Sequence, residues 1–198
     1  MSDILYDSSI EYGSLKDVIY KIVVGRKGKS YILMLHFPSE SFFHLAGLQH
    51  LKDLKFPSKN KERIYKEIVS GNLTIKDVRK SVFFDKWFIE ERLQNFHFLE
   101  QMIESNSITY LINARRYITY TDIKADYLCE YFLDNEVLYL FLVKERSPKF
   151  ENECKGYSFF RKHEYDYTIG TAKTSTLLIE KVKDGKKSTI YRNPVYRE

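Results

Sequence analysis

The hydrophobic pattern of the chain changes near residue 106, and this change limits the folds that the chain can adopt. Before it, apolar residues in 38–105 recur at helical spacing. After it, short runs rich in β-branched and aromatic residues, Tyr117–Tyr120 among them, are separated by turn signals such as Asp134-Asn135 and Asp184-Gly185. Helices and strands that are segregated along a chain indicate an α+β fold and not a wound α/β sheet.

Two further features locate the sheet. Val137–Val143 (VLYLFLV) is apolar on both faces, which predicts a central strand. Near the N-terminus, Val18–Val24 and Tyr31–Phe37 flank a loop with two glycines and predict a hairpin. We therefore predict one α+β domain over residues 1–198, in which the hairpin and the helices pack on one face of an antiparallel sheet. Its parts are a β-hairpin in 1–37, a helical part in 38–105 and the sheet in 106–198.

Capping residues divide the helical part. Ser39 is a suitable N-cap for a helix that ends near Phe56, and Ser58 can cap a helix over Lys59–Val69. Thr74 and Asp77 have capping-box spacing for a short helix that ends at Ser81. The longest helical pattern runs from Asp85 to Glu104.

The composition indicates a folded protein in a reducing compartment. Apolar residues make up 43% of the chain and aromatic residues 16%, which is too much for a disordered chain. The sequence contains no run of about 18 uncharged apolar residues and begins without the apolar segment of a secretory signal. Cys129 and Cys154 match no zinc or redox spacing, so we expect a cytoplasmic protein that is not bound to membranes.

The excess of positive charge lies near the C-terminus. Residues 1–154 contain 22 basic and 22 acidic side chains, whereas residues 155–198 contain 10 basic and 5 acidic ones. This asymmetry fits a positive face that binds a phosphate-bearing partner. It fits equally well a solvated end that keeps the protein soluble.

Two of the five histidines, His44 and His50, lie in the segment FPSESFFHLAGLQHLKDL. On a continuous helix their side chains point about 120° apart and do not share one stripe. Gly47 between them costs roughly 1 kcal/mol relative to alanine in a helix, which suggests the close approach of another element or of a ligand. One interpretation is that both rings are core residues that donate to backbone carbonyls, and the other is that they are catalytic.

Common catalytic motifs do not explain the chain. It has no HExxH, no histidine pair at i,i+4 spacing and no GxSxG elbow. The loop GRKGKS lacks the spacing of a phosphate-binding loop and joins two strands. We therefore expect neither a metal site nor a cofactor.

The sheet part carries polar side chains among aromatic ones. They are Lys124 and Asp126 at the start of a strand, on one face of it, Ser158 with Arg161 and Lys162 at the end of another, and Lys173 in a hydroxyl-rich stretch. Each by itself reads as a residue of a sheet surface or edge. Together they suit single-stranded RNA, because aromatic rings stack on bases while lysine and arginine hold phosphates.

Several of these segments resemble a known family when they are taken in order. FFHLAGLQHLKDL, KERIYKEIVSGNLTIKDVRKS, a long helix, IKADYL, YLFLV and YSFF are similar to the phage-associated barnase/EndoU/colicin/RelE-like nuclease domains, the PBECR group, in its fourth subfamily. The resemblance spans Phe37 to Val182, and its strongest parts have the patterns FxHLxGLxxLxD and TxxDVxKS. It implies helices packed on an antiparallel sheet and a metal-independent ribonuclease or toxin-like activity of phage or mobile-element origin.

If this implication holds, the reaction is RNA transesterification, which needs an acid, a base and cations at the phosphate. We assign His44 or His50 as acid and base, Lys124 with Arg161 as phosphate stabilisers, and Ser158 as a hydrogen-bond donor. Tyr127 or Tyr157 would stack on a base, and Lys162 and Lys173 would bind the substrate. The expected partners are RNA and, for a toxin, an antitoxin or another protein.

Two other functions remain open on sequence grounds. The same fold is able to serve as a non-catalytic module that binds nucleic acid or a protein. It also suits a small structural protein of a mobile element whose basic end serves solubility. Catalysis requires at least one of the two histidines to reach a basic cleft, and RNA binding predicts a steep dependence on salt.

Overall fold

The computed structural model describes residues 3–105, 107–112, 121 and 123–197. The helices in these ranges are α1 (Ile4–Gly13), α2 (Ser41–Leu45), α3 (Lys61–Val69), α4 (Ile75–Val78), α5 (Ile89–Gln94) and α6 (Phe98–Glu104), with single 3₁₀ turns η1 (Leu48–His50), η2 (Asp85–Trp87) and η3 (Asn95–His97). The strands are β1 (Val18–Arg26), β2 (Lys29–His36), β3 (Ile108–Leu111), β4 (Tyr127–Leu133), β5 (Glu136–Lys144), β6 (Glu153–Arg161), β7 (Ala172–Lys173), β8 (Ser175–Lys183) and β9 (Lys186–Arg192).

The described strands form one mixed sheet in the order β7-β3-β4-β5-β6-β2-β1-β8-β9. Neighbouring strands are antiparallel except β2 and β6, which pair in parallel over three residues. The predicted hairpin is confirmed as β1 and β2, but it lies inside the sheet and does not pack on its face. VLYLFLV is confirmed as the interior strand β5, between β4 and β6.

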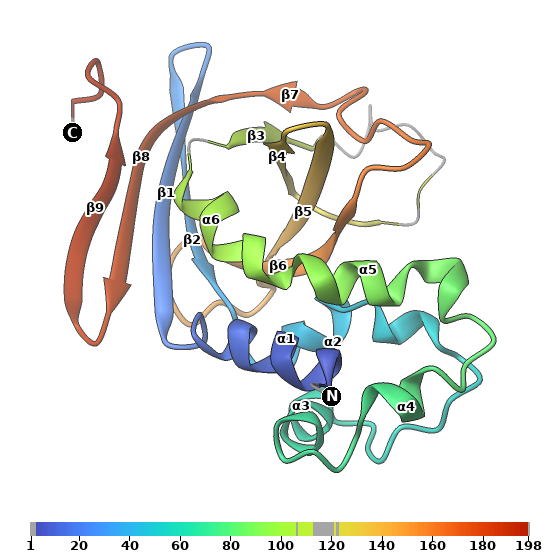
Figure 1. The fold of residues 1–198 in the computed structure, drawn as a ribbon. Helices are drawn as coiled ribbons and strands as arrows, with labels where there is room; N and C mark the ends of the chain where they lie inside the picture. Colours follow the sequence, from blue (N-terminus) through green and yellow to red (C-terminus); the bar gives the residue numbers. More distant parts are fainter. Residues whose placement is uncertain (1–2, 106, 113–120, 122, 198) are drawn as a thin grey trace.

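The sheet curls because one extended stretch of chain pairs at two distant places. β7 pairs with β3, and β8 follows after one residue and pairs with β1. Thr174, between them, donates from its backbone and its hydroxyl to the carbonyl of Thr109. Figure 1 shows β7 and β8 as one long band that crosses the top of the molecule and then runs down beside β1. The curled sheet therefore encloses apolar side chains that a flat sheet would expose.

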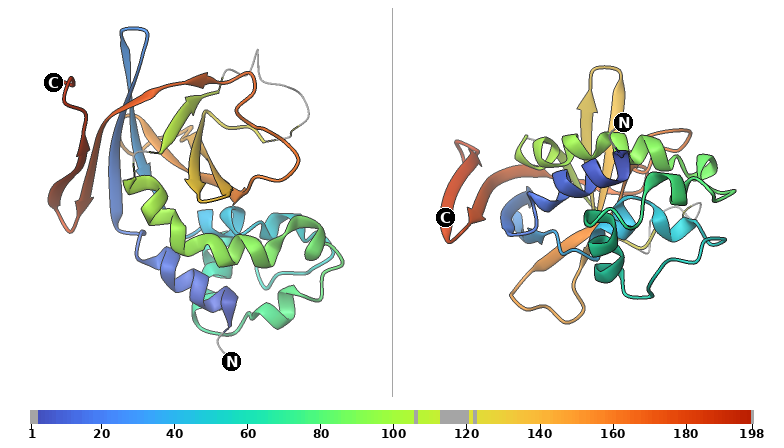
Figure 2. Two further views of the ribbon diagram at one scale, coloured as in Figure 1. Left: turned by 45° about the horizontal axis from the view of Figure 1, so that its top comes forward. Right: turned by 60° about the horizontal axis from the view of Figure 1, so that its bottom comes forward.

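The helices gather at one end of the sheet. Figures 1 and 2 show α1–α4 grouped together there, with α5 and α6 alongside them. Within this group α2 lies directly against β6, where Leu45 approaches Gly156. The N-terminus lies among these helices, and the C-terminus follows β9 at the opposite edge. The prediction of an α+β fold is confirmed. None of the helices that the structure describes has the length and apolarity to span a bilayer.

Several local predictions hold where the interaction is short in sequence. Asp134, Asp184 and Gly185 have positive φ in the two predicted turns, and the Asp77 carboxylate accepts from the backbone N–H and the hydroxyl of Thr74. The cap of α3 is Asn60 and not Ser58, because its side chain accepts from the backbone of the third helical residue. The strand expected at Tyr117–Tyr120 lies outside the described residues.

Two helices that the sequence pattern predicts as continuous are broken. The pattern from Asp85 to Glu104 is divided into η2, α5, η3 and α6, and Phe88 has a left-handed backbone with φ 51°. The helix expected from Ser39 to Phe56 ends at Leu45. In addition, residues 1–37, predicted as a β-hairpin alone, also contain α1, which is capped by Asp3 and precedes the hairpin. Tertiary packing overrides the hydrophobic period at these places.

Candidate active site

A change of chain direction at Gly47, after α2, brings the two histidines near each other. Gly47 has φ 75°, and η1 continues in a new direction. A Cβ on Gly47 would lie 2.9 Å from Cδ of Arg92, so a larger residue is excluded by packing as well as by backbone conformation. The prediction that the two rings project from one continuous helix is therefore wrong. The rings are near enough for His44 to lower the pKa of His50.

His44 contacts a lysine and a tyrosine from two other elements. Its Nε2 lies 2.5 Å from Nζ of Lys61, the first residue of α3. Its ring stacks on Tyr157 of β6, with the centroids 5.5 Å apart and the planes at 21°. Burial, then the charges of Lys61 and Lys155, lowers the pKa of His44 to about 4. The neutral ring thus accepts a hydrogen bond from the Lys61 ammonium group.

His50 lies against Trp87, the only tryptophan of the chain. The two rings are parallel within 12° and their centroids are 3.9 Å apart. The side-chain nitrogen of Gln49 lies 3.1 Å from Nε2 of His50. Burial, then the charge of Arg92, lowers the pKa of His50 to about 4. This ring is also neutral at pH 7, and no ammonium or guanidinium group donates to it within the described residues.

Arg92 is the buried cation of this region, with 6% of its surface exposed. Its Nε donates to the carbonyl of Trp87 at 3.1 Å. Its Nη1 donates to the carbonyl of Phe159 at 3.2 Å and to Oγ of Ser158 at 3.5 Å. The guanidinium carbon lies 4.8 Å from the ring centroid of Phe160. These contacts fix the side chain in one orientation between α5 and β6.

No carboxylate of the described residues lies within 4.0 Å of Arg92, Lys61, His44 or His50. Burial lowers the pKa of Arg92 to about 10, so the group stays charged at pH 7. A buried cation without a paired anion is costly. The arrangement therefore favours binding of an anion, and the planar guanidinium matches the geometry of both carboxylate and phosphate groups.

A β-bulge and a glycine in the middle of β6 allow α2 and His44 to pack against this strand. Phe141 of β5 pairs with Ser158 and Leu142 pairs with Gly156, so Tyr157 is an extra residue in a β-bulge. A Cβ on Gly156 would lie 3.0 Å from a methyl carbon of Leu45, and its absence lets α2 approach the strand. The bulge and the glycine together place the Tyr157 ring against His44.

The structure brings together four of the residues predicted as functional: His44, His50, Tyr157 and Ser158. Arg161 pairs instead with Glu136 at 2.7 Å and with Glu91 at 3.8 Å. Lys124 is exposed before β4, and no hydrogen bond, ion pair or ring contact of the described residues joins it to either histidine.

The remaining predicted binding residues lie apart from this group. Only 4% of Tyr127 is exposed, and its ring belongs to the hydrophobic core, so it offers no free face for a base. Lys162 is paired with Asp166 at 2.8 Å. Lys173 is exposed on β7, the strand at the other end of the sheet order from β9.

His44, His50, Tyr157 and Ser158 are joined by four residues that the sequence did not point to, and we call the whole cluster the histidine group. The four are Lys61, Trp87, Arg92 and Lys155. Arg92 lies within the helical pattern from Asp85 to Glu104, among polar residues that are normally exposed, yet it is buried. The one sequence signal for its position was Gly47, whose missing Cβ implied the close approach of another element. Lys61 and Trp87 lie in segments whose placement against α2 and η1 depends on the tertiary fold.

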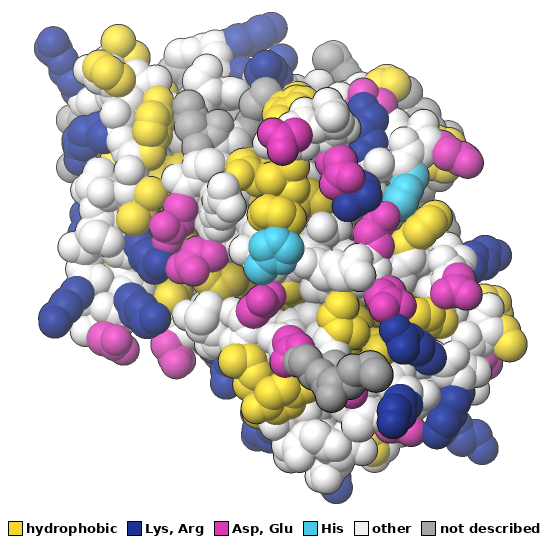
Figure 3. All heavy atoms as spheres, in the orientation of Figure 1, with side chains coloured by type: hydrophobic (Ala, Val, Ile, Leu, Met, Phe, Trp, Pro, Cys, Tyr) yellow, Lys and Arg dark blue, Asp and Glu magenta, His cyan; other side chains and the backbone are white. Residues whose placement is uncertain are grey.

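The C-terminal excess of basic residues lies mostly elsewhere. Lys181 of β8 is paired with Glu100 and Glu104, and Lys187 of β9 is paired with Glu180. On the face shown in Figure 3, basic and acidic side chains are interspersed and form no continuous basic surface. Lys155 of β6 affects the histidine group through its charge, although it is itself paired with Glu145.

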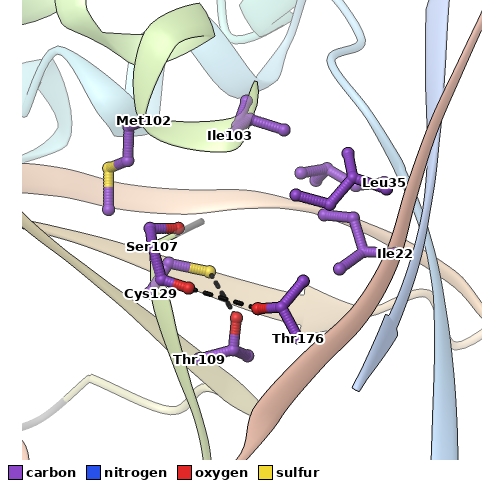
Figure 4. Close-up of a pocket in the computed structure, with 9 residues that line it drawn as sticks. Ile22, Leu35, Met102, Ile103, Ser107, Thr109, Cys129 and Thr176 are labelled. Atoms are coloured by element: carbon purple, nitrogen blue, oxygen red, sulfur yellow. Dashed lines mark hydrogen bonds between the residues drawn. The ribbon is translucent and has the colours of Figure 1, made fainter. Parts of the chain in front are cut away.

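The cavity drawn in Figure 4 is separate from the histidine group. It lies inside the curled sheet beneath α6, has a volume of about 10 Å³ and has room for about one water molecule. Its polar lining is already engaged, since Thr176 donates to the carbonyl of Ser107 and Thr109 contacts the thiol of Cys129. We assign it to the packing of the core.

The two neutral rings make stability depend on pH. In the unfolded chain both histidines have a pKa near 6.5, whereas in the folded protein it is about 4. Between these values the unfolded state binds protons that the folded state excludes. The free energy of unfolding is therefore expected to fall as pH is lowered from 6.5 to 4, by at most about 1.4 kcal/mol per pH unit for each ring.

Urea unfolding at pH 7.0, 5.5 and 4.5 measures this dependence. The double variant with His44→Gln and His50→Gln is expected to lose less stability over the same range than wild type. The control is His97→Gln, because His97 is exposed and bonded only to a carbonyl of its own helical segment. Equal pH dependence in wild type and the double variant would show that the rings are not held neutral.

Comparison with known proteins adds one finding. A family model described as phage-Barnase-EndoU-ColicinE5/D-RelE like nuclease4 (PBECR4) matches residues 4–193. No curated protein and no solved structure shows significant similarity to the chain. The match covers both the helical part and the sheet, so it includes every residue of the histidine group.

Proposed function

The chain belongs to the PBECR4 family of phage-associated nuclease-like domains, and from this membership we propose that it is a metal-independent ribonuclease. The substrate is single-stranded RNA, and the products are a 2′,3′-cyclic phosphate and a 5′-hydroxyl. The observation that carries the proposal is a pair of neighbouring neutral imidazoles, of which His50 lies beside a buried arginine that has no carboxylate partner and His44 beside Lys61. The charged groups beside the two imidazoles are the cations of Arg92 and Lys61, whereas a metal-dependent nuclease would have carboxylates that bind the metal.

His50 is the base in this proposal. The lone pair of its neutral ring accepts from the Gln49 amide and not from a cation. The 2′-hydroxyl displaces this amide, and the ring takes its proton as the oxygen attacks the adjacent phosphorus. Arg92 lies close enough to affect the pKa of His50, and its fixed guanidinium stabilises the negative charge that builds on the phosphoryl oxygens. Ser158, which already accepts from Arg92, helps to hold the guanidinium in place.

His44 and Lys61 together are the acid. Lys61 donates to Nε2 of His44, so the pair holds one proton between two nitrogens. The 5′-oxygen takes this proton as its bond to phosphorus breaks. Burial and the charge of Lys155 lower the pKa of Lys61, which makes the proton easier to release. Tyr157, stacked on His44, orients the ring.

A non-catalytic RNA-binding module is the second candidate. The 2.5 Å contact between Lys61 and His44 favours it, because a lone pair that already accepts a hydrogen bond is not free to act on a substrate. In that case Arg92 and Lys61 would bind phosphate and the histidines would be structural. RNA would then bind without being cleaved, and binding would weaken steeply with salt.

The test is incubation of the purified protein with mixed single-stranded RNA in EDTA, followed by analysis of the ends. We expect products that carry 2′,3′-cyclic phosphate, and the matched all-2′-deoxy oligonucleotide is expected to stay intact because it lacks the nucleophile. Products only when Mg²⁺ is added would contradict metal independence. RNA that binds but stays uncut in every buffer would support the binding module.

A further inference from the structure

A second pair of stacked rings lies directly beside the histidine group. Phe88 stacks on His163, with their centroids 4.0 Å apart and the planes at 19°. Phe88 follows Trp87 in the chain, and its carbonyl accepts from the backbone N–H of Arg92. The stack of His50 on Trp87 and the stack of Phe88 on His163 thus involve adjacent residues of the chain, both of which bond to Arg92 through their backbone carbonyls.

The Phe88 ring is exposed at a cost in backbone strain. Its exposed fraction is 47%, which is high for a phenylalanine beside a buried charged group. Its backbone has φ 51°, a conformation that bulky residues seldom adopt and that costs of order 1 kcal/mol or more. Glycine or asparagine would satisfy this conformation more easily, so the backbone conformation does not explain why an aromatic ring is found here.

The partner ring is oriented by a polar network. Nε2 of His163 lies 3.1 Å from a carboxylate oxygen of Glu91. The other oxygen of Glu91 lies 3.8 Å from Arg161, which also pairs with Glu136. Since Glu91 holds the edge of the imidazole, the face of His163 is fixed against Phe88. Among the described residues His163 is the one ring that stacks on Phe88, so the opposite face of Phe88 carries no other ring.

We propose that Phe88, backed by His163, is a stacking subsite for an unpaired nucleobase next to the scissile phosphate. The inference rests on the proposed function, because it takes RNA as the ligand of the histidine group. The carboxylates of Glu91 and Glu136 more than neutralise the charge of Arg161, so the subsite suits an uncharged base and not a phosphate. An aromatic face binds any base, which implies stacking with little sequence preference.

Binding of a single-stranded oligonucleotide with 2′-O-methyl groups tests the subsite, because it cannot be cleaved by 2′-hydroxyl attack. Fluorescence anisotropy would compare wild type with Phe88→Ala, Phe88→Trp and Tyr6→Ala. We expect Phe88→Ala to raise Kd about 5- to 150-fold and Phe88→Trp to keep wild-type affinity. Tyr6→Ala is the matched control, because Tyr6 is exposed on α1 and should leave Kd unchanged.

An abasic position identifies the contact. Moving one abasic nucleotide along the oligonucleotide should reveal a position at which the missing base weakens binding to wild type but has little effect on binding to Phe88→Ala. Equal Kd values for wild type and Phe88→Ala would overturn the subsite, as would the absence of measurable binding by wild type. Cleavage that proceeds while Phe88→Ala binds normally rejects the subsite alone. If Phe88→Ala binds more weakly but wild type cleaves no RNA, the ribonuclease proposal is rejected and the subsite is kept.

Discussion

Replacing His50 with glutamine is expected to lower the rate of RNA cleavage about 10²- to 10⁴-fold, the range that general acid–base groups contribute. Glutamine keeps the polar character and much of the size of the ring but cannot take up a proton. Initial rates on a short fluorescent RNA, at saturating and at low substrate, measure the effect. The loss should appear in kcat, because the base acts on the transition state and not on substrate binding.

The matched control for this variant is His97→Gln. His97 is exposed and its Nδ1 contacts the carbonyl of Gln94, outside the group formed by His44, His50 and Arg92. It should cleave RNA at the wild-type rate. If correctly folded His50→Gln also cleaves at that rate, His50 is not the base, and the assignment of the two rings must be reversed or abandoned.

Phe42→Ala is expected to produce the largest loss of stability, about 3–5 kcal/mol. Phe42 is completely buried and packs against Tyr12, Tyr65 and Phe96 at centroid distances of 5.4, 5.5 and 5.1 Å. Truncation removes these contacts and leaves a cavity where α1, α2, α3 and η3 meet. Urea unfolding at pH 7 gives the difference in free energy.

The control here is Phe132→Ala on β4, where 57% of the side chain is exposed. Its truncation should change the free energy of unfolding by no more than about 0.5 kcal/mol. A loss below 1 kcal/mol for Phe42→Ala would mean that the four-ring cluster can collapse around the missing side chain. Because Phe42 lies two residues before His44, such a collapse would also move the histidine and should lower the cleavage rate.

Features that depend on neighbours in the chain follow from the sequence. The hairpin of β1 and β2, the turn at Asp184-Gly185 and the capping pair of Thr74 and Asp77 are all confirmed. Each involves residues that are close in sequence, so backbone preference and local hydrogen bonds decide the outcome. The α+β class and the family also followed from patterns along the chain.

Features do not follow from the sequence alone where contacts distant in sequence override the helical period. Gly47 and Phe88 end or interrupt helices that the hydrophobic pattern alone would continue. At Gly47 the reason is the Arg92 side chain, which occupies the space of a Cβ. Arg161, by contrast, was predicted at the phosphate but is paired with Glu91 and Glu136, residues whose positions depend on α5 and β5.

The sequence by itself determined the class of fold. It also identified His44, His50, Tyr157 and Ser158 as candidate site residues. Only the tertiary structure decided which cations accompany them. Arg92 and Lys61 approach the histidines because α5 and α3 pack against α2 and β6, and those contacts depend on shape and burial across many residues. Desolvation then lowers both histidine pKa values, and no pattern along the chain encodes the burial that causes this.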